Sequence, residues 1–141
     1  MDRKEFIKST CGICVAMSTG FLWSLIEACK TPLSVYKTTA ASNIVRVPLT
    51  EFKESNYKVI RISDYDYDLA VQKNVDDSFS VMVLMCTHAG HPLTKTGQNY
   101  YCTLHGSQFD HEGHVTKGPA SRDLKHLQAK TDNDFLLIQL S

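Results

Sequence analysis

The 141-residue chain lacks a net charge, a long apolar run and any internal repeat. Fifteen basic residues balance fifteen acidic ones, and the absence of a positive excess argues against a nucleic-acid-binding function. The mostly apolar segment 11–26 is shorter than the roughly 20 residues of a membrane-spanning helix, so a permanent anchor is the less favoured interpretation. The length suits one small domain with a single core.

Helical periodicity is also missing after residue 43, where no long stretch repeats its apolar residues every 3.6 positions. Short alternating or β-branched runs predict strands instead. The expected strands are residues 44–48, 57–62, 69–72, 79–85, 99–103 and 135–140. Turn-prone pieces such as 74–77 and 132–134 lie between them. The pattern predicts an all-β sandwich or barrel.

Cysteine is scarce, with five in the chain, and two of the five stand beside histidine. Cys86 precedes His88 by two positions, and Cys102 precedes His105 by three. Two thiolates and two imidazoles form the mixed ligand set of a Rieske [2Fe–2S] centre. A structural zinc site could use the same four donors, although zinc fingers usually pair two cysteines and then two histidines. An empty site is a further alternative.

The neighbouring residues resemble the two cluster-binding loops of the Rieske iron–sulfur family. The first loop is residues 86–90 (Cys-Thr-His-Ala-Gly), and the second is residues 102–110 (Cys-Thr-Leu-His-Gly-Ser-Gln-Phe-Asp). Residues 118–120 (Gly-Pro-Ala) resemble the Pro loop that covers the cluster in the Rieske subunits of cytochrome bc-type complexes. This resemblance, over about residues 44–140, implies an antiparallel β sandwich or barrel with a cluster-binding subdomain formed by two loops.

The resemblance also implies a role for each donor. Cys86 and Cys102 would bind the inner, all-sulfur iron, and His88 and His105 would bind the outer iron near the tip of the protein. Neutral imidazoles donate less charge than thiolates, so the outer iron accepts the electron and the potential rises. An imidazole bound to ferric iron also loses its remaining proton more readily, so the site could take an electron and a proton from a quinol.

Some positions around the cluster differ from the bc-type pattern, and such positions tune the potential. His91 and Leu104 replace the two cysteines of an inter-loop disulfide, and Phe109 replaces a tyrosine whose hydroxyl bonds a ligand sulfur. Ser107 matches a serine that donates to a bridging sulfide. We therefore expect a potential below the bc-type members and above all-cysteine ferredoxins, within about −150 to +300 mV.

Further residues are expected around the cluster or away from it. Gly90 and Gly106 would allow the backbone to approach the sulfides closely, and Pro119 would lie in the covering loop. His91 is expected to act as a spacer. The remaining histidines are expected to be surface imidazoles without a metal role, and they are His111, His114 and His126.

The N-terminal residues 1–28 predict an export signal, with Arg3 and Lys4 before the apolar segment. The start resembles a twin-arginine signal with lysine as its second basic residue. That route carries folded proteins, as a cluster assembled in the cytoplasm would need. Residues 26–29 (Ile-Glu-Ala-Cys) resemble a lipobox, which would acylate Cys29. Residues 29–43 would then be a flexible tether and residues 44–141 the Rieske domain.

Together these features predict one-electron transfer through a [2Fe–2S] cluster at the outer, periplasmic face of a bacterial membrane. The protein would be a subunit of a quinol-oxidising or related oxidoreductase complex, with a cytochrome or molybdenum subunit as partner, or a free-standing ferredoxin-like carrier. A structural zinc-binding or metal-free interaction module is the alternative.

Overall fold

The computed structural model describes residues 33–140, and the predictions that fall on residues 1–32 lie outside this part of the chain. The described residues form thirteen strands and one short 3₁₀ helix, Leu49–Phe52. The strands are β1 Val35–Thr38, β2 Ala40–Ala41, β3 Ile44–Pro48, β4 Tyr57–Ile62, β5 Asp68–Lys73, β6 Phe79–Val83, β7 Thr94–Thr96, β8 Asn99–Tyr101, β9 Gln108–Phe109, β10 Val115–Lys117, β11 His126–Leu127, β12 Ala129–Asp132 and β13 Phe135–Gln139.

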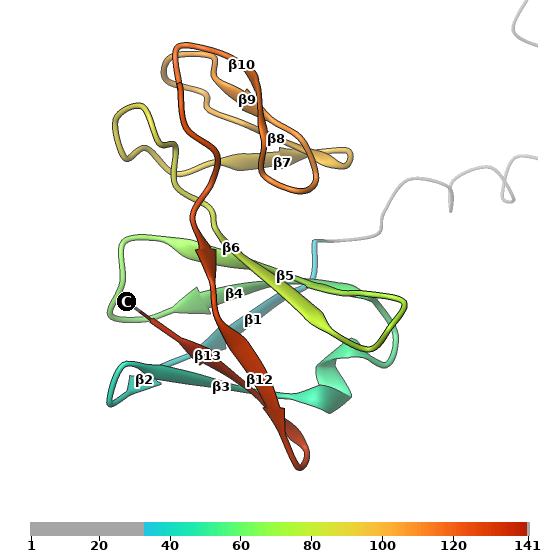
Figure 1. Ribbon diagram of the computed structural model, residues 1–141. Helices are drawn as coiled ribbons and strands as arrows, with labels where there is room; N and C mark the ends of the chain where they lie inside the picture. The colour runs from blue at the N-terminus through green and yellow to red at the C-terminus, as the bar shows by residue number, and fades with distance from the viewer. Residues whose placement is uncertain (1–32, 141) are drawn as a thin grey trace, which may run out of the picture. The chain divides into compact units, whose positions relative to one another are not determined.

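Three sheets organise these strands (Figure 1). A five-stranded sheet in the order β1-β4-β5-β6-β11 and a four-stranded sheet in the order β12-β13-β3-β2 form what we call the base region, residues 33–83 and 125–140. A second four-stranded sheet, β10-β9-β8-β7, belongs to the tip region, residues 84–124. The chain enters the tip region after β6 and returns to the base region at β11. The tip region is thus a continuous insertion between two paired strands.

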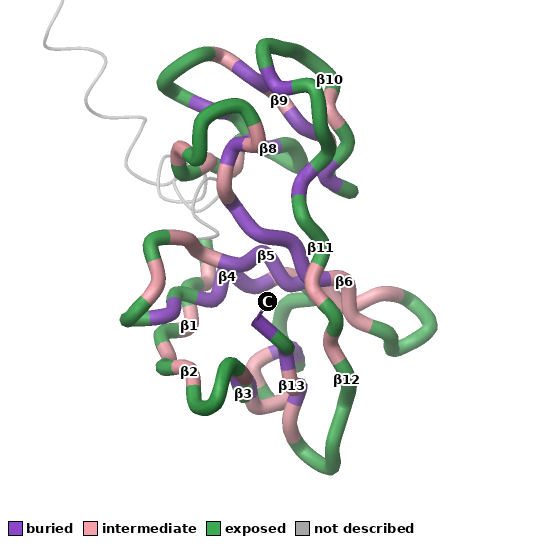
Figure 2. The backbone as a smooth tube through the Cα atoms, turned by 60° about the vertical axis from the view of Figure 1, so that its left-hand side comes forward, coloured by how far each residue is buried: buried purple, intermediate pink, exposed green. Residues whose placement is uncertain are grey.

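Alternating apolar residues build the base region. In β3, Val45 and Val47 are fully buried while Arg46 between them is exposed, as expected for a strand with one face on a core. In the neighbouring β13, Leu136 pairs with Val47 and Ile138 pairs with Val45. Each such buried side chain contributes about 1.5–3 kcal/mol relative to exposure. The burial-coloured trace shows this interior along β4, β5 and β6 (Figure 2).

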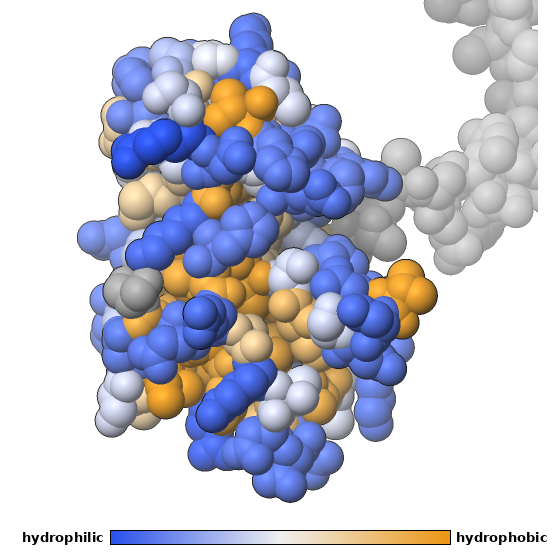
Figure 3. Space-filling model, in the orientation of Figure 1, coloured by the Kyte–Doolittle hydropathy of each residue, from blue (hydrophilic) through white to orange (hydrophobic). Residues whose placement is uncertain are grey.

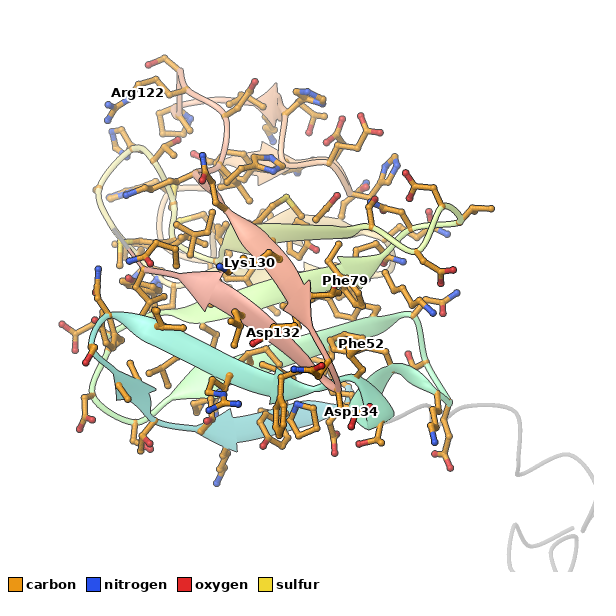
Figure 4. All side chains as sticks on the ribbon, turned by 60° about the horizontal axis from the view of Figure 1, so that its bottom comes forward. Phe52, Phe79, Arg122, Lys130, Asp132 and Asp134 are labelled. Atoms are coloured by element: carbon orange, nitrogen blue, oxygen red, sulfur yellow. The ribbon has the colours of Figure 1, made fainter. Side chains whose placement is uncertain are left out.

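Aromatic residues close one end of the base-region core. Phe52, from the 3₁₀ helix, and Phe79, from β6, meet edge to face with their ring centroids 5.0 Å apart (Figure 4). Such pairs add about 0.5–1.5 kcal/mol beyond area burial. Hydrophilic side chains cover much of the face in Figure 3. Among residues 33–140 the large apolar side chains that are exposed are Leu33, Val35, Val75, Tyr101 and Leu104.

The flexible tether expected at residues 29–43 is wrong for its described part. β1 pairs in parallel with β4, from Val35 opposite Val59 to Thr38 opposite Ile62, and β2 pairs with β3. Tyr36 packs against the base-region core. The Thr, Ser and Ala content suggested flexibility, but Val, Tyr and Thr also favour strands when a partner edge is available. Residues 29–32 lie outside the described part.

The all-β fold is confirmed, with one exception to the antiparallel expectation, because β1 and β4 run parallel. Two of the expected strands, 44–48 and 57–62, have the bounds of β3 and β4. The expected strand 79–85 ends earlier, at Val83 in β6. The sequence did not predict β7 or β9–β12, which have two to four residues each. None of the helices among residues 33–140 has the length and apolar character to cross a membrane.

Candidate metal centre

The first candidate ligand loop, residues 86–91, follows β6 and folds back on its own cysteine. The backbone N–H of Cys86 donates to the carbonyl of His91 at 2.7 Å. The N–H of Gly90 donates in turn to the carbonyl of Cys86 at 2.8 Å. A bridge between Met85 and Pro92 closes the base of the loop. The loop therefore holds Cys86 from both sides without any disulfide.

The second loop, residues 102–107, follows β8 and repeats this arrangement. The N–H of Cys102 donates to the carbonyl of Ser107 at 2.8 Å, and the N–H of Gly106 donates to the carbonyl of Cys102 at 2.9 Å. In both loops a glycine stands four residues after the cysteine with a positive φ, +68° at Gly90 and +80° at Gly106. A side chain is disfavoured in this left-handed region, which explains glycine at both positions.

The two cysteines lie in the interior, and their thiols are free. Cys86 is 2% exposed and Cys102 is fully buried. Burial acts most strongly on the Cys102 thiol and would raise its pKa. The N–H groups of His105, Leu104 and Gly106 and the Cys86 side chain hydrogen-bond to it and outweigh burial, so its pKa is lowered overall. The loop thus favours the thiolate form that binds metals.

The two candidate histidine ligands are exposed, in contrast to the cysteines. The Nδ1 atoms of His88 and His105 are 3.3 Å apart, and the two rings meet at 87° with their centroids 4.9 Å apart. Each Nδ1 atom therefore faces the other, as two donors to one metal atom would. An exposed imidazole pair can exchange an electron with a docked partner.

The donors form two pairs rather than a single group of four. Within residues 33–140, no three His, Cys, Asp or Glu side chains are grouped so that they could hold one metal ion. A tetrahedral zinc site needs all four donors around a single ion. A thiolate pair and an imidazole pair instead fit a cluster of two irons, in which each iron takes two protein ligands.

The Pro loop and the residues just after it contact both ligand loops. The N–H of Ala120 donates to the Ser107 hydroxyl at 3.0 Å in a buried contact, whereas Pro119 is exposed. The Thr87 hydroxyl donates to the carbonyl of Arg122 at 2.5 Å, and the Arg122 guanidinium donates to the carbonyl of Thr87 at 3.4 Å. Figure 4 shows Arg122 at the opposite end of the domain from the β12–β13 hairpin, which carries Asp132 and Asp134.

Ser107 and Phe109 lie inside the tip region. Ser107 is fully buried, and the Ala120 contact uses its hydroxyl as an acceptor, so the hydroxyl proton remains available to a second partner. Phe109 is also fully buried and packs in an apolar cluster with Tyr100 and Cys102. Its ring offers no hydroxyl to a sulfur atom.

His91 was expected to act as a spacer, but its side chain also makes a contact. Its Nε2 lies 3.4 Å from the Thr103 hydroxyl, which links the two ligand loops. Leu104, the other residue that replaces a disulfide cysteine of the bc-type pattern, is 58% exposed. Thr87, Thr103 and Arg122 were not predicted from the sequence as site residues. The one available signal was that a threonine follows each of the two cysteines.

The remaining histidines are exposed, as expected: His111, His114 and His126. His114 Nδ1 lies 3.2 Å from a carboxylate oxygen of Asp110, and this hydrogen bond raises the pKa of the imidazole. His126 Nε2 contacts the carbonyl of Glu112 at 3.0 Å. These contacts serve the turn between β9 and β10.

Comparisons with known proteins agree with the all-β fold and indicate the family. Residues 43–128 match the model of the Rieske [2Fe-2S] domain family. The cytochrome b6-f complex iron-sulfur subunit 1 of Nostoc sp. (strain PCC 7120) is 27% identical over 98% of this chain and 84% of its own length. The ubiquinol-cytochrome c reductase iron-sulfur subunit of Rickettsia typhi is 39% identical over 48% of this chain and 40% of its own length.

Among solved structures, the plasma membrane Rieske protein PetC3 from Synechocystis PCC 6803 has the same fold, with a TM-score of 0.54 and 24% identity. The alignment covers 67% of this chain and 98% of that one. The cytochrome b6-f complex iron-sulfur subunit 2 of the same Nostoc strain is 40% identical, and the chain spans about a third of its length, 31%.

The fold and the paired thiolate and imidazole loops define an electron-transfer domain of the iron–sulfur class. The chain belongs to the Rieske [2Fe-2S] domain family. Its cofactor is a Rieske-type [2Fe–2S] cluster, and its function class is electron transfer. The comparisons give no support to the zinc-binding or metal-free alternative.

Proposed function

We propose that Cys86 and Cys102 bind the inner iron of the cluster and that His88 and His105 bind the outer iron. The pairing of the side chains is the observation that carries this proposal. Both thiols are buried, the Cys86 side chain helps to lower the pKa of Cys102, and the imidazole Nδ1 atoms of His88 and His105 approach within 3.3 Å. Each pair supplies two donors to one metal atom, as a Rieske centre requires.

The surrounding residues then have separable roles. The bound cluster supplies reversible one-electron chemistry. The buried cysteines and the apolar cluster around Phe109 and Tyr100 keep water from the sulfur side. His88 and His105 form the exposed edge through which an electron enters and leaves. We assign no catalytic residue among residues 33–140, because these side chains hold and shield the carrier.

The proposed setting is a quinol-oxidising or related oxidoreductase complex of a bacterial membrane. Two relatives support it by their names: one is a subunit of a cytochrome b6-f complex, and the other is a subunit of ubiquinol-cytochrome c reductase. Affinity purification of the tagged chain from native membranes tests the setting. A stoichiometric cytochrome b or molybdenum subunit is expected, and recovery of the chain alone after mild cross-linking contradicts it.

A free-standing, ferredoxin-like carrier is the second candidate, and two observations favour it. No disulfide joins the ligand loops, and Phe109 lacks the hydroxyl that would stabilise the reduced cluster. Both features lower the potential relative to the bc-type members. A midpoint potential well below that of the host's quinol pool would favour this carrier, and one at or above the pool would favour the complex.

The proposed location is the outer, periplasmic face of the membrane, reached by the export signal of residues 1–28 and held by acylated Cys29. A buried acyl chain contributes about 0.8 kcal/mol per CH₂, so the several chains of a lipoprotein would anchor it stably. Replacing Cys29 with alanine should move the protein from the membrane to the released fraction. Cys14→Ala is the matched control, and release of both variants, or of neither, contradicts the lipid anchor.

A further inference from the structure

The tip region needs contacts between its loops because its sheet offers little support. Strands β7–β10 have two or three residues each. The two candidate ligand loops, residues 86–91 and 102–107, are longer than any of these strands. Within residues 33–140 the cysteines are the two candidate ligands, so no disulfide joins these loops while both thiolates bind the cluster.

Side-chain contacts connect the three loops pairwise. The Pro loop contacts the second ligand loop through Ala120 and Ser107, and Arg122, just after the Pro loop, contacts Thr87 of the first. The remaining connection, from the first ligand loop to the second, is the contact of His91 with Thr103. With this contact the three connections form a closed ring.

The positions of His91 and Thr103 relate this contact to the two cysteines. The carbonyl of His91 accepts the N–H of Cys86 at 2.7 Å, so the His91 backbone is fixed relative to one candidate ligand. Thr103 directly follows the other candidate ligand, Cys102. A contact between the two side chains therefore constrains the spacing of the cysteines. The distance of 3.4 Å is at the long end of the hydrogen-bond range, and either partner can donate, depending on the imidazole tautomer.

We propose that His91 and Thr103 form a non-covalent clasp that positions the two ligand loops and keeps the cluster in place. They are positioning residues, because they act through the spacing of Cys86 and Cys102 rather than by touching the metal. The inference rests on the ligand assignment proposed above. The clasp differs from a covalent link in one practical respect, since thiol reductants cannot open it.

The rate of cluster loss tests the clasp in the full-length holoprotein. The visible absorbance of the cluster is followed after addition of an iron chelator, for His91→Ala, Thr103→Val and the double variant. We expect each single variant to lose the cluster at least threefold faster than the wild type. The double variant should be no faster than the faster single variant, because two residues of one contact act together.

Conservative and control variants distinguish loss of the His91–Thr103 contact from general destabilisation of the fold. His91→Gln keeps a polar group that can reach a hydroxyl, and Thr103→Ser keeps the hydroxyl, so both should return within twofold of the wild-type rate. His111→Ala removes an exposed imidazole outside the ring of contacts and should not change the rate. The clasp would be overturned if His91→Ala lost the cluster at the wild-type rate. It would also be overturned if the rate increase in the double variant equalled the product of the two single increases.

A second measurement covers variants that fail to take up the cluster. If the contact of His91 with Thr103 also positions the loops in the apoprotein, alkylation of Cys86 and Cys102 there should be faster in His91→Ala and Thr103→Val than in the wild type. Equal alkylation rates would overturn the clasp. A wild-type holoprotein without a mixed-ligand EPR signal would instead overturn the ligand assignment and leave the alkylation result to decide on the clasp.

Discussion

The base region and the tip region differ in strand length and in what they bury. β3–β6 and β13 have five or six residues each, and their buried side chains are mainly aliphatic. β7–β10 have two or three residues, and the tip-region interior contains two cysteines, Tyr100 and Phe109. The base region thus gains stability from burial at about 1.5–3 kcal/mol per large apolar side chain. The tip region depends more on hydrogen bonds, at about 1 kcal/mol each, and on its cofactor.

We infer from this contrast that the cluster site can be disturbed without unfolding the base region, although the tip-region interior also packs on Val59, Ala70 and Met82 of β4, β5 and β6. The tip region is one continuous insertion between β6 and β11, so its loops can change while the pairing of those two strands remains. Substitutions in either region therefore test whether the two regions respond independently.

The largest effect is expected from a candidate ligand in the tip region. Cys102→Ser replaces a buried thiol with a lowered pKa by a hydroxyl that does not ionise at neutral pH. We expect complete loss of the cluster, seen as loss of bound iron and of the Rieske EPR signal, while far-ultraviolet circular dichroism retains the β signature. Stoichiometric iron in this variant would contradict the ligand assignment.

In the base region, Leu136→Ala should destabilise the fold by about 2–5 kcal/mol, because it leaves a cavity in a fully buried site. Denaturant unfolding of the apoprotein measures the loss. The EPR line shape of the folded holoprotein should match that of the wild type, because Leu136 belongs to the aliphatic cluster of the base region. An altered line shape would show that the two regions are coupled.

A smaller effect is expected from the backbone conformation of the ligand loops, where Gly106 has a positive φ. Gly106→Ala places a Cβ on a residue with φ of +80°, at a cost of about 1–2 kcal/mol. The nearest neighbouring atom would be 4.0 Å away, so the cost is conformational rather than a clash. Gly118→Ala, with no positive φ and no neighbour nearer than 3.9 Å, is the matched control. Equal unfolding free energies for the two variants would contradict this explanation.

The smallest effect concerns the potential. Phe109→Tyr adds a hydroxyl inside the tip region, where it can donate to a ligand sulfur and stabilise the more negative reduced state. One such bond of about 1 kcal/mol corresponds to a rise of roughly 40 mV for a one-electron couple. A redox titration of both proteins measures the shift. An unchanged or lower midpoint would show that the new hydroxyl does not reach the sulfur.

The sequence predicted the base region better than the tip region for a physical reason. β3 and β4 show alternating or β-branched residues over five or six positions, which is enough for a periodic signal. A two-residue strand such as β9 shows no period, and its pairing with β8 depends on the surrounding loops. β1 was missed because its partner, β4, is remote in the sequence.

The residues of the candidate site also differ in how well the sequence predicted them. Spacing within each loop was enough to predict Cys86, His88, Cys102 and His105 as ligands, and this assignment stays a prediction. The contact of Thr87 with Arg122 spans 35 positions, and that of His91 with Thr103 spans 12. Contacts of this kind depend on how the loops meet in the folded tip region. No pattern within either loop encodes them.

The EPR spectrum of the dithionite-reduced, full-length protein, purified from a host that exports it, tests directly for the mixed-ligand cluster. We expect a Rieske-type signal from one [2Fe–2S] cluster per chain, with the average g value of mixed histidine and cysteine ligation. A folded protein that contains no iron, or an iron signal typical of four cysteine ligands, would contradict it.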